Sequence, residues 1–343
     1  MTRFGIYAAA LSIAFCACDT VETSSTEQDG RQLQGRQLQG RQLQGMNLQG
    51  MTLQGIRVSG ATFGDQPLSQ VHVLLGEVVA QRGSTMLRGT ALAGAQFQGQ
   101  ARNLNVSPPT TAVVDFKITA VIPEVSKWDP THTGHTFLYT LEQRVADTGT
   151  WQPACDADED GRSVAIPLTA TWNEHGDRVE SSSLFTFGCT SGVIAKCYRW
   201  GYRPWVTGFG DLIAMHETCT RLARADYCGI GVPGTRNGTT INVWDTLPSP
   251  GPIQTHDNLL GLPIPLPPAG FLFEAGWNTE GAVCLSHSRW ILDDGLGIAA
   301  LCPDRLVPPG LLGETVCDVV GEVLNLDTNA RMFNEAQLNL LGP

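Results

Sequence analysis

Apolar and polar residues alternate along much of the chain after about residue 110. Six segments show this pattern: 111–122, 135–145, 163–172, 181–189, 271–277 and 281–290. Because successive side chains of a β-strand point to opposite faces, a period of two predicts strands. Gly, Asp, Pro and Thr residues separate the segments, as turns require. We therefore expect residues 110–343 to form a mostly β domain of the α+β class, built from antiparallel strands.

One segment of this region has the period of a helix instead. In residues 211–228, Met215, Cys219 and Leu222 recur on one face, and Asp211 is placed to act as the N-cap. Two arginines lie near the end of the segment, where positive charge interacts favourably with the helix dipole. We expect this to be the one main helix of the domain.

A different period governs the region before residue 100. Leucine recurs every five residues from Leu33 to Leu53, Val58 and Phe63 continue the series, and a glycine follows two residues after each of the first six. A period of five fits neither a helix nor a strand. It resembles the pentapeptide-repeat proteins, and this resemblance implies a square right-handed β-solenoid. The segment 88–100 repeats the spacing.

The charge of the first repeats limits where such a solenoid can begin. In the register of that family, Arg31, Arg36 and Arg41 would point inward, and burying each charge would cost several kcal/mol. We therefore expect residues 18–45 to be a flexible Gln/Gly-rich tether and residues 46–100 to be a short irregular solenoid. The alternative is that the whole repeat is disordered, because two coils bury little surface.

The N-terminus has the features of an export signal. Arg3 precedes an apolar run that is too short to cross a bilayer, so we assign residues 1–17 to a signal peptide. Its end, Ala17-Cys18, resembles the bacterial lipoprotein cleavage box, in which the cysteine is acylated. We expect Cys18 to anchor an envelope lipoprotein in the membrane, on the periplasmic side or at the cell surface. Secretion without lipid is the alternative.

The composition narrows the class of partner. The formal net charge is -11 and there is no run of Lys or Arg. Such a chain is poorly suited to phosphate backbones, so we expect no nucleic acid partner.

The cysteines indicate an oxidising compartment. With Cys16 and Cys18 set aside, an even number is left, which in an exported chain indicates disulfides. No two are at zinc-finger spacing. The expected disulfide cysteines are Cys155, Cys189, Cys197, Cys219, Cys228, Cys284, Cys302 and Cys317. Their pairing does not follow from the sequence.

Several ordered motifs carry a resemblance to a known family. They are FTFGCTSGVIAKCYRWGYRPW at 185–205, ARADYCG at 223–229, GTTINVWD at 238–245, EAGW at 274–277 and GAVCLSHSRW at 281–290. Together they resemble the ADYC domain, over roughly residues 150–300. The resemblance implies an exported, cysteine-bearing domain of unassigned function, and it brings no catalytic residues with it.

An acidic loop is a candidate metal site. Asp156, Asp158 and Asp160 alternate before Gly161, as the oxygen ligands of a calcium loop do. Pro167 stands where such a loop has its bidentate glutamate. We therefore expect no required cofactor, with calcium as the one candidate. The alternative is a solvated acidic turn.

Aromatic residues provide a candidate binding surface. The segment 198–205 holds four aromatic residues and two arginines, and Trp200, Tyr202 and Trp205 could stack on a sugar or on the aromatic groups of a partner. The alternative is a packed seam of the core.

Three titratable residues in the recognised motifs are candidates for a site: Asp226, Glu274 and His287. The alternative is structural, with Asp226 capping the turn after the helix and Glu274 paired with Arg289. His216 and Cys219 are spaced for a nucleophile and its base, but a bridged cysteine could not serve.

Two functional hypotheses follow. The first is a non-catalytic envelope lipoprotein that binds a protein or a polysaccharide. The second is an envelope or extracellular hydrolase that uses carboxylate and His groups. The sequence has no GxSxG, HExxH or phosphate-binding glycine motif, which favours the first.

We predict that Cys18 carries a fatty acyl group. In cells fed radiolabelled fatty acid, the wild-type protein should be labelled, and Cys18→Ser should not be, because serine keeps the size of the side chain but lacks the thiol. Cys16→Ser is the matched control and should stay labelled. Equal labelling of Cys18→Ser and wild type would contradict the assignment.

Overall fold

The computed structural model describes most of the region after residue 52. The described residues are 31–33, 53–103, 108–124, 136–158, 160–235, 239–248, 253–254, 271–289 and 330–337. Among them, no helix has the length and apolar character needed to span a membrane. The predicted signal peptide and Cys18 lie outside these residues.

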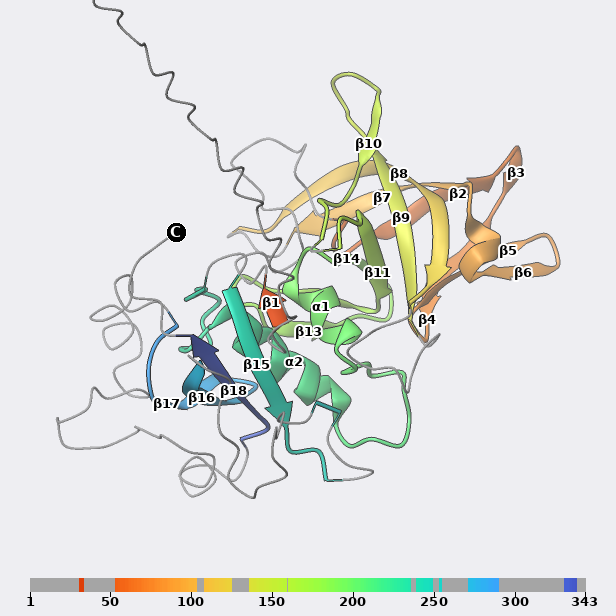
Figure 1. The fold of residues 1–343 in the computed structure, drawn as a ribbon. Coiled ribbons are helices and arrows are strands. Elements are labelled where there is room, and N and C mark those ends of the chain that lie inside the picture. The colour runs from red at the N-terminus through yellow and green to blue at the C-terminus, as the bar shows by residue number, and fades with distance from the viewer. Residues whose placement is uncertain are drawn as a thin grey trace, which may run out of the picture.

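A large sheet of eight strands forms one side of the molecule (Figure 1). Its strands follow the order β14-β11-β9-β8-β7-β2-β3, and β10 pairs with β9. They are β2 (Arg57–Phe63), β3 (Gln66–Pro67), β7 (Ala95–Asn103), β8 (Thr110–Pro123), β9 (Phe137–Arg144), β10 (Trp151–Pro153), β11 (Val164–Leu168) and β14 (Thr186–Cys189). The sheet curves strongly and encloses a core on its inner face.

A second sheet has five strands in the order β1-β15-β18-β16-β17. They are β1 (Arg31–Leu33), β15 (Thr239–Asp245), β16 (Phe271–Asn278), β17 (Gly281–Leu285) and β18 (Met332–Gln337). Two smaller sheets complete the part of the fold that the structure describes. One contains β4 (Ser69–Leu74), β5 (Glu77–Arg82) and β6 (Thr85–Arg88), and the other β12 (Ala170–Trp172) and β13 (Arg178–Glu180).

Every pairing among the described strands is antiparallel, so the expectation of a mostly β, antiparallel fold is confirmed. The strand segments predicted at 111–122, 135–145 and 271–277 correspond to β8, β9 and β16.

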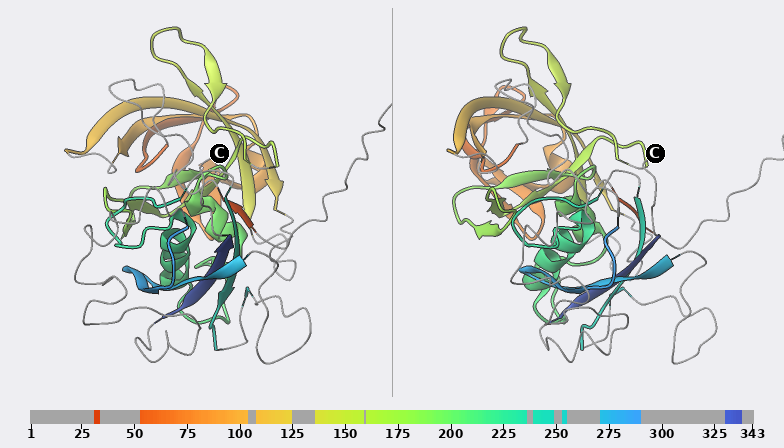
Figure 2. Two further views of the ribbon diagram at one scale, coloured as in Figure 1. Left: turned by 60° about the vertical axis from the view of Figure 1, so that its left-hand side comes forward. Right: turned by 90° about the vertical axis from the view of Figure 1, so that its left-hand side faces the viewer.

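Two helices lie between the large and the five-stranded sheet (Figure 2). The predicted helix is α2 (Leu212–Arg224), and Asp211 caps it by accepting a hydrogen bond from the backbone N–H of Ala214 at 3.0 Å. Its buried face packs on the five-stranded sheet. The second helix, α1 (Val193–Arg199), was not predicted. All its residues are buried, so it has no polar face to produce a helical period.

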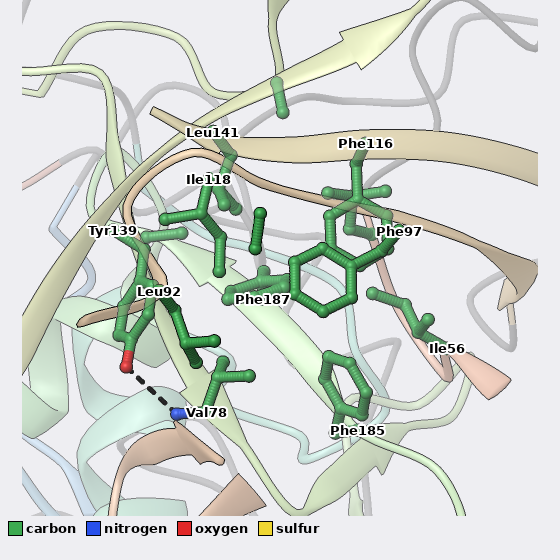
Figure 3. Packing of buried hydrophobic residues seen from close by; sticks show 14 of the residues in the cluster. Ile56, Val78, Leu92, Phe97, Phe116, Ile118, Tyr139, Leu141, Phe185 and Phe187 are labelled. Carbon is green, nitrogen blue, oxygen red and sulfur yellow. Dashed lines mark hydrogen bonds between the residues drawn. The ribbon is translucent and has the colours of Figure 1, made fainter. Parts of the chain in front are cut away.

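The core under the large sheet is aromatic (Figure 3). Phe97 of β7 stacks on Phe116 of β8 at 4.9 Å between ring centroids, and Phe116 meets Phe187 of β14 edge to face at 5.7 Å. The hydroxyl of Tyr139 accepts a hydrogen bond from the backbone N–H of Val78 at 2.9 Å. The ring contacts join strands within the large sheet, and the hydrogen bond of Tyr139 ties the three-stranded sheet to the large one.

The solenoid prediction is wrong for the described part of residues 46–100. There β2 pairs with β7 and β7 with β8, so the second repeat patch is part of the large sheet. Ala95 and Phe97 are buried, as the repeat register requires, but residues two apart also share one face of a strand. The inward pairs of a pentapeptide repeat are therefore compatible with a sheet, and the long strand β8 provides the neighbour that a solenoid coil would have supplied.

The predicted tether needs a correction as well. Of residues 18–45, the structure describes only Arg31–Leu33, and these form β1 at the edge of the five-stranded sheet. We expected no packing from this unit because its arginine would be buried in a solenoid. An edge strand pairs through its backbone and imposes no such burial.

The described cysteines are oxidised, which confirms the disulfide prediction for them. Cys155 bonds Cys189, and Cys197 of α1 bonds Cys219 of α2. Cys228 and Cys284 are disulfide-bonded too. The first two bridges close separations of 34 and 22 residues. Each should stabilise the fold by about 3 to 4 kcal/mol by restricting the unfolded chain. Cys302 and Cys317 lie outside the described residues.

The turn between β4 and β5 has an unusual backbone. Leu75 and Gly76 have positive φ angles of 51° and 76°. A methyl group on Gly76 would lie 2.7 Å from carbons of the Trp205 ring. This glycine is therefore needed both for its conformation and for the close approach of the indole.

We predict that Gly76→Ala lowers the free energy of unfolding by roughly 2–4 kcal/mol, because strain in the left-handed region adds to overpacking against Trp205. Gly83→Ala is the matched control. Gly83 has a φ of 59°, and a methyl group added there would have no atom within 4 Å, so only the strain of about 1–2 kcal/mol should remain. Denaturant unfolding measures both variants. Equal losses would show that Trp205 does not restrict the turn.

Candidate functional site

The string Ala225-Asp226-Tyr227-Cys228 forms the exit from α2. Ala225 is the C-cap residue and adopts the left-handed conformation, with a φ of 52°. Asp226 is fully buried, and its carboxylate accepts backbone N–H groups of Ile230 and Gly231 at 3.1 and 2.9 Å. It also forms an ion pair with Arg221 at 2.7 Å. Asp226 thus caps the turn after the helix.

Tyr227 extends this exit into the five-stranded sheet. Its ring stacks on Trp277 of β16 at 5.3 Å between centroids. Its hydroxyl donates to Glu274 Oε1 at 3.0 Å and accepts the backbone N–H of Arg289 at 2.9 Å. Burial, and after it the negative charge of Glu274, raises the pKa of Tyr227 well above its usual value. The hydroxyl therefore remains a donor at any physiological pH.

Glu274 and Arg289 form a two-point ion pair in the interior. Both side chains are fully buried, with 2.9 Å between Nε and Oε2 and 2.8 Å between Nη2 and Oε1. Asn334 of β18 donates to the same carboxylate at 2.7 Å. Burial alone would lower the pKa of Arg289, but the charge of Glu274, the neighbouring Tyr227 and the hydrogen bonds to Glu274 together outweigh burial, and the pKa is raised. Each of the two groups is hydrogen-bonded from more than one side.

Arg289 also completes the C-terminus of α2. It donates to the backbone carbonyls of Leu222 and Ala223 at 3.0 and 3.3 Å. The last carbonyls of a helix have no partner within it and carry partial negative charge, so a cation at this position satisfies both needs. The ion pair therefore links the end of the helix to the sheet beneath it.

The three titratable candidates for a site, Asp226, Glu274 and His287, do not form one constellation. Asp226 and Glu274 each bind their own arginine, as the structural alternative expects. The ring of His287 lies near the backbone carbonyls of Ser288 and Leu272, at 3.1 and 3.4 Å, and not near either carboxylate. The arrangement suits a rigid junction, in which neither carboxylate is open to a substrate.

The acidic loop is bound by arginine. One oxygen of Asp158 accepts the backbone N–H groups of Asp160 and Arg162, at 3.0 and 2.8 Å. Its other oxygen lies 3.4 Å from Arg199 of α1. Asp160 forms ion pairs with the side chains of both Arg162 and Arg199. The described residues contain no group of three His, Cys, Asp or Glu side chains placed to hold a metal ion. This arrangement favours the acidic-turn alternative, although Asp158 is buried and not solvated. The third predicted ligand, Asp156, is half-buried in the same loop.

The aromatic segment 198–205 is divided between core and surface. Trp200 and Tyr202 are 1% and 0% exposed, so they belong to the core seam and cannot present an open platform. Tyr202 donates to Asp245 at 2.9 Å. Only Trp205 is partly exposed, and it stacks on Tyr198 at 5.1 Å between centroids.

His216 and Cys219 cannot form a nucleophilic pair, because Cys219 is bonded to Cys197. His216 is fully buried and stacks on Tyr198 at 3.8 Å between centroids. Its Nε2 donates to the carbonyl of Ile194 at 3.0 Å. Burial, together with the charge of Arg178, lowers the pKa of His216 to about 3. The imidazole is therefore neutral and serves the packing of the two helices.

A further surface was not predicted: the outer face of the large sheet, opposite the core. Gln96, Gln98 and Gln100 are exposed on β7, and the register places Gln96 beside Lys117 and Gln98 beside Asp115 on β8. Gln98 donates to Asp115 at 3.1 Å. The alternation of QFQGQ at 96–100 carried this information, but we interpreted it as a solenoid repeat.

An aromatic ring lies at one side of this outer face. Trp151 of β10 is half-buried, and the Lys117 ammonium lies 4.7 Å from its ring centroid. Lys117 also forms an ion pair with Glu142 of β9 at 2.6 Å. The exposed Gln96, Gln98 and Gln100, together with the partly exposed Asp115, Lys117, Glu142 and Trp151, are called the glutamine face.

We predict that Arg289→Met lowers the free energy of unfolding by about 3–5 kcal/mol, because it leaves Glu274 charged and unpaired in the interior. The double variant Glu274→Met/Arg289→Met should lose less than the single one, since no lone charge remains. Lys117→Met, which breaks a partly exposed pair, is the control and should change stability by less than about 1 kcal/mol. A double variant less stable than Arg289→Met would refute this account.

Comparison with known proteins assigns the chain to a family. The chain matches the family model of the ADYC domain over residues 89–291, which is 203 of its 343 residues. No curated protein and no solved structure matches it. The matched range begins at the short 3-10 helix Gly89–Leu92, earlier than the motifs indicated, and it includes both helices and the ion pair of Glu274 and Arg289. The chain belongs to the ADYC domain family.

Proposed function

We propose that this protein is a non-catalytic binding protein of the cell envelope, anchored by lipid on Cys18, and that its ligand is a polysaccharide held on the glutamine face. The observation that carries the proposal is the glutamine face itself, an exposed row of amide side chains beside a half-buried indole. The hydrolase alternative has less support, because Asp226 and Glu274 are held in buried ion pairs.

The chemistry of the glutamine face suits sugar hydroxyls. Each glutamine amide offers both donors and acceptors, as a ring of hydroxyl groups requires. An indole presents a broad apolar face and a polar edge, which suits the apolar face of a sugar ring. The two-residue period of β7 repeats the glutamine amides along the strand, which suits a repeating polymer.

The charges of the glutamine face favour a neutral ligand. Lys117 pairs with Glu142 across the strands, and Asp115 accepts a hydrogen bond from Gln98. With one positive and two negative groups, the face has only a small net charge, so it has no strong field of one sign to select a charged polymer. We therefore place a neutral polysaccharide first and expect binding that depends little on salt.

Native gel electrophoresis in gels that contain a neutral soluble glucan tests this function. The wild-type chain should be retarded, and Trp151→Ala should reduce the affinity roughly fivefold or more, because it removes one aromatic contact worth about 1 kcal/mol or more. Gln98→Ala/Gln100→Ala should weaken retardation as well. Thermal unfolding of each variant checks that the fold is intact.

Trp205→Ala is the matched control, since Trp205 is also a partly exposed tryptophan but lies far along the chain in the aromatic segment. It should leave retardation unchanged. Loss of retardation in Trp205→Ala but not in Trp151→Ala would move the site away from the glutamine face. No retardation of the wild-type chain by any neutral polymer would overturn the polysaccharide assignment.

A further inference from the structure

The edge of the five-stranded sheet is covered by a piece of the N-terminal repeat. β1 pairs with the first part of β15 in the register Arg31↔Ile241, Gln32↔Thr240 and Leu33↔Thr239. β1 has three residues and is the outermost strand, beyond which no described strand continues the sheet. This is the geometry of strand addition, in which an extended segment joins a sheet edge through its backbone groups.

The strand-forming residues belong to a unit that occurs three times. The sequence RQLQG stands at 31–35, 36–40 and 41–45 without any change, whereas the next two units begin with methionine. An edge that accepts the first unit offers the same backbone partners and the same neighbouring side chains to the other two. Identical units can therefore differ in docking only through the chain that links them to the domain.

These linkers differ modestly. Between Leu33 and Leu53 there are 19 residues, whereas between Leu43 and Leu53 there are 9 (53 − 33 − 1 and 53 − 43 − 1). Halving a flexible loop changes the closure equilibrium by only about threefold. Loop entropy alone therefore does not restrict docking to one of the three units.

We propose that the outer edge of β15 is a docking site for one RQLQG unit at a time, and that the three identical units of this chain exchange on it. The occupant is a unit of the same chain, because a covalently linked segment is present at an effective concentration in the millimolar range. The site goes beyond the proposed function and does not depend on it.

Exchange would set the number of residues between Cys18 and the docked unit. When the next unit along the chain docks instead, this segment becomes five residues longer, which is about 17 Å of extended chain. If Cys18 is the anchor, the distance between membrane and domain changes in these steps. Only this consequence depends on the proposed lipid anchor.

Hydrogen exchange of the full chain tests the docking site. Proline removes a backbone donor and is poorly accommodated in a paired strand, so Gln32→Pro should prevent docking of the first unit alone. Amides of 239–241 should keep their protection in Gln32→Pro, because another unit takes the place of the first. In the triple variant Gln32→Pro/Gln37→Pro/Gln42→Pro they should exchange roughly tenfold faster or more.

Gln28→Pro is the matched control, since it makes the same change just before the repeats, and it should have no effect. Exchange within α2 reports on the intact fold and should be the same in all variants. If Gln32→Pro alone exposes 239–241 as fully as the triple variant does, the units are not interchangeable. If the triple variant leaves exchange unchanged, the edge does not bind the repeat.

A second copy of the chain is the competing occupant. Protection of 239–241 in Gln32→Pro should be independent of protein concentration, and the chain should remain monomeric by light scattering. Protection that disappears on dilution together with a loss of dimers would show donation between copies and would overturn docking within one chain.

Discussion

The buried ion pair between Glu274 and Arg289 is the contact on which the C-terminal half of the domain depends. Two charges removed from water are tolerated only when their hydrogen-bonding capacity is satisfied. Here Tyr227 and Asn334 donate hydrogen bonds to the carboxylate of Glu274. The guanidinium of Arg289 donates hydrogen bonds to the last backbone carbonyls of α2. Parts of α2, β16 and β18 that lie far apart in the sequence are thereby joined at one point.

This contact also explains the string from which the family takes its name. Ala225 turns the chain out of the helix, Asp226 binds the backbone after the turn, and Tyr227 reaches the ion pair. Cys228 adds a disulfide bond. The string is thus architectural: it stabilises the junction between α2 and the five-stranded sheet.

The two large sheets protect their surfaces differently. The eight-stranded sheet buries one face against its aromatic core and presents the other to solvent (Figure 3). The five-stranded sheet has its edge strand β15 covered by a three-residue segment of the repeat. An open edge would invite pairing with other chains, so a covering strand from the same chain is protective. One short repeat then has a structural role even though its composition is that of a linker.

Local patterns in the sequence determined those features that depend on neighbours along the chain. The helix 212–224 followed from its apolar face and the Asp211 cap, and the long strands β8, β9 and β16 followed from alternation. Disulfide bonding of the described cysteines was predicted from the even number of cysteines.

Only the tertiary structure decided which alternatives were realised at the candidate sites. α1 is buried on all sides, so its sequence has no helical period. Trp200 and Trp205 look alike in the sequence, yet one is in the core and the other near the surface. The repeat from 53 to 100 formed a sheet because β8, from outside the repeat, supplied a partner edge. Whether a side chain is buried, and which ion pair it forms, depends on residues tens of positions away in the chain. Local patterns in the sequence do not specify these contacts.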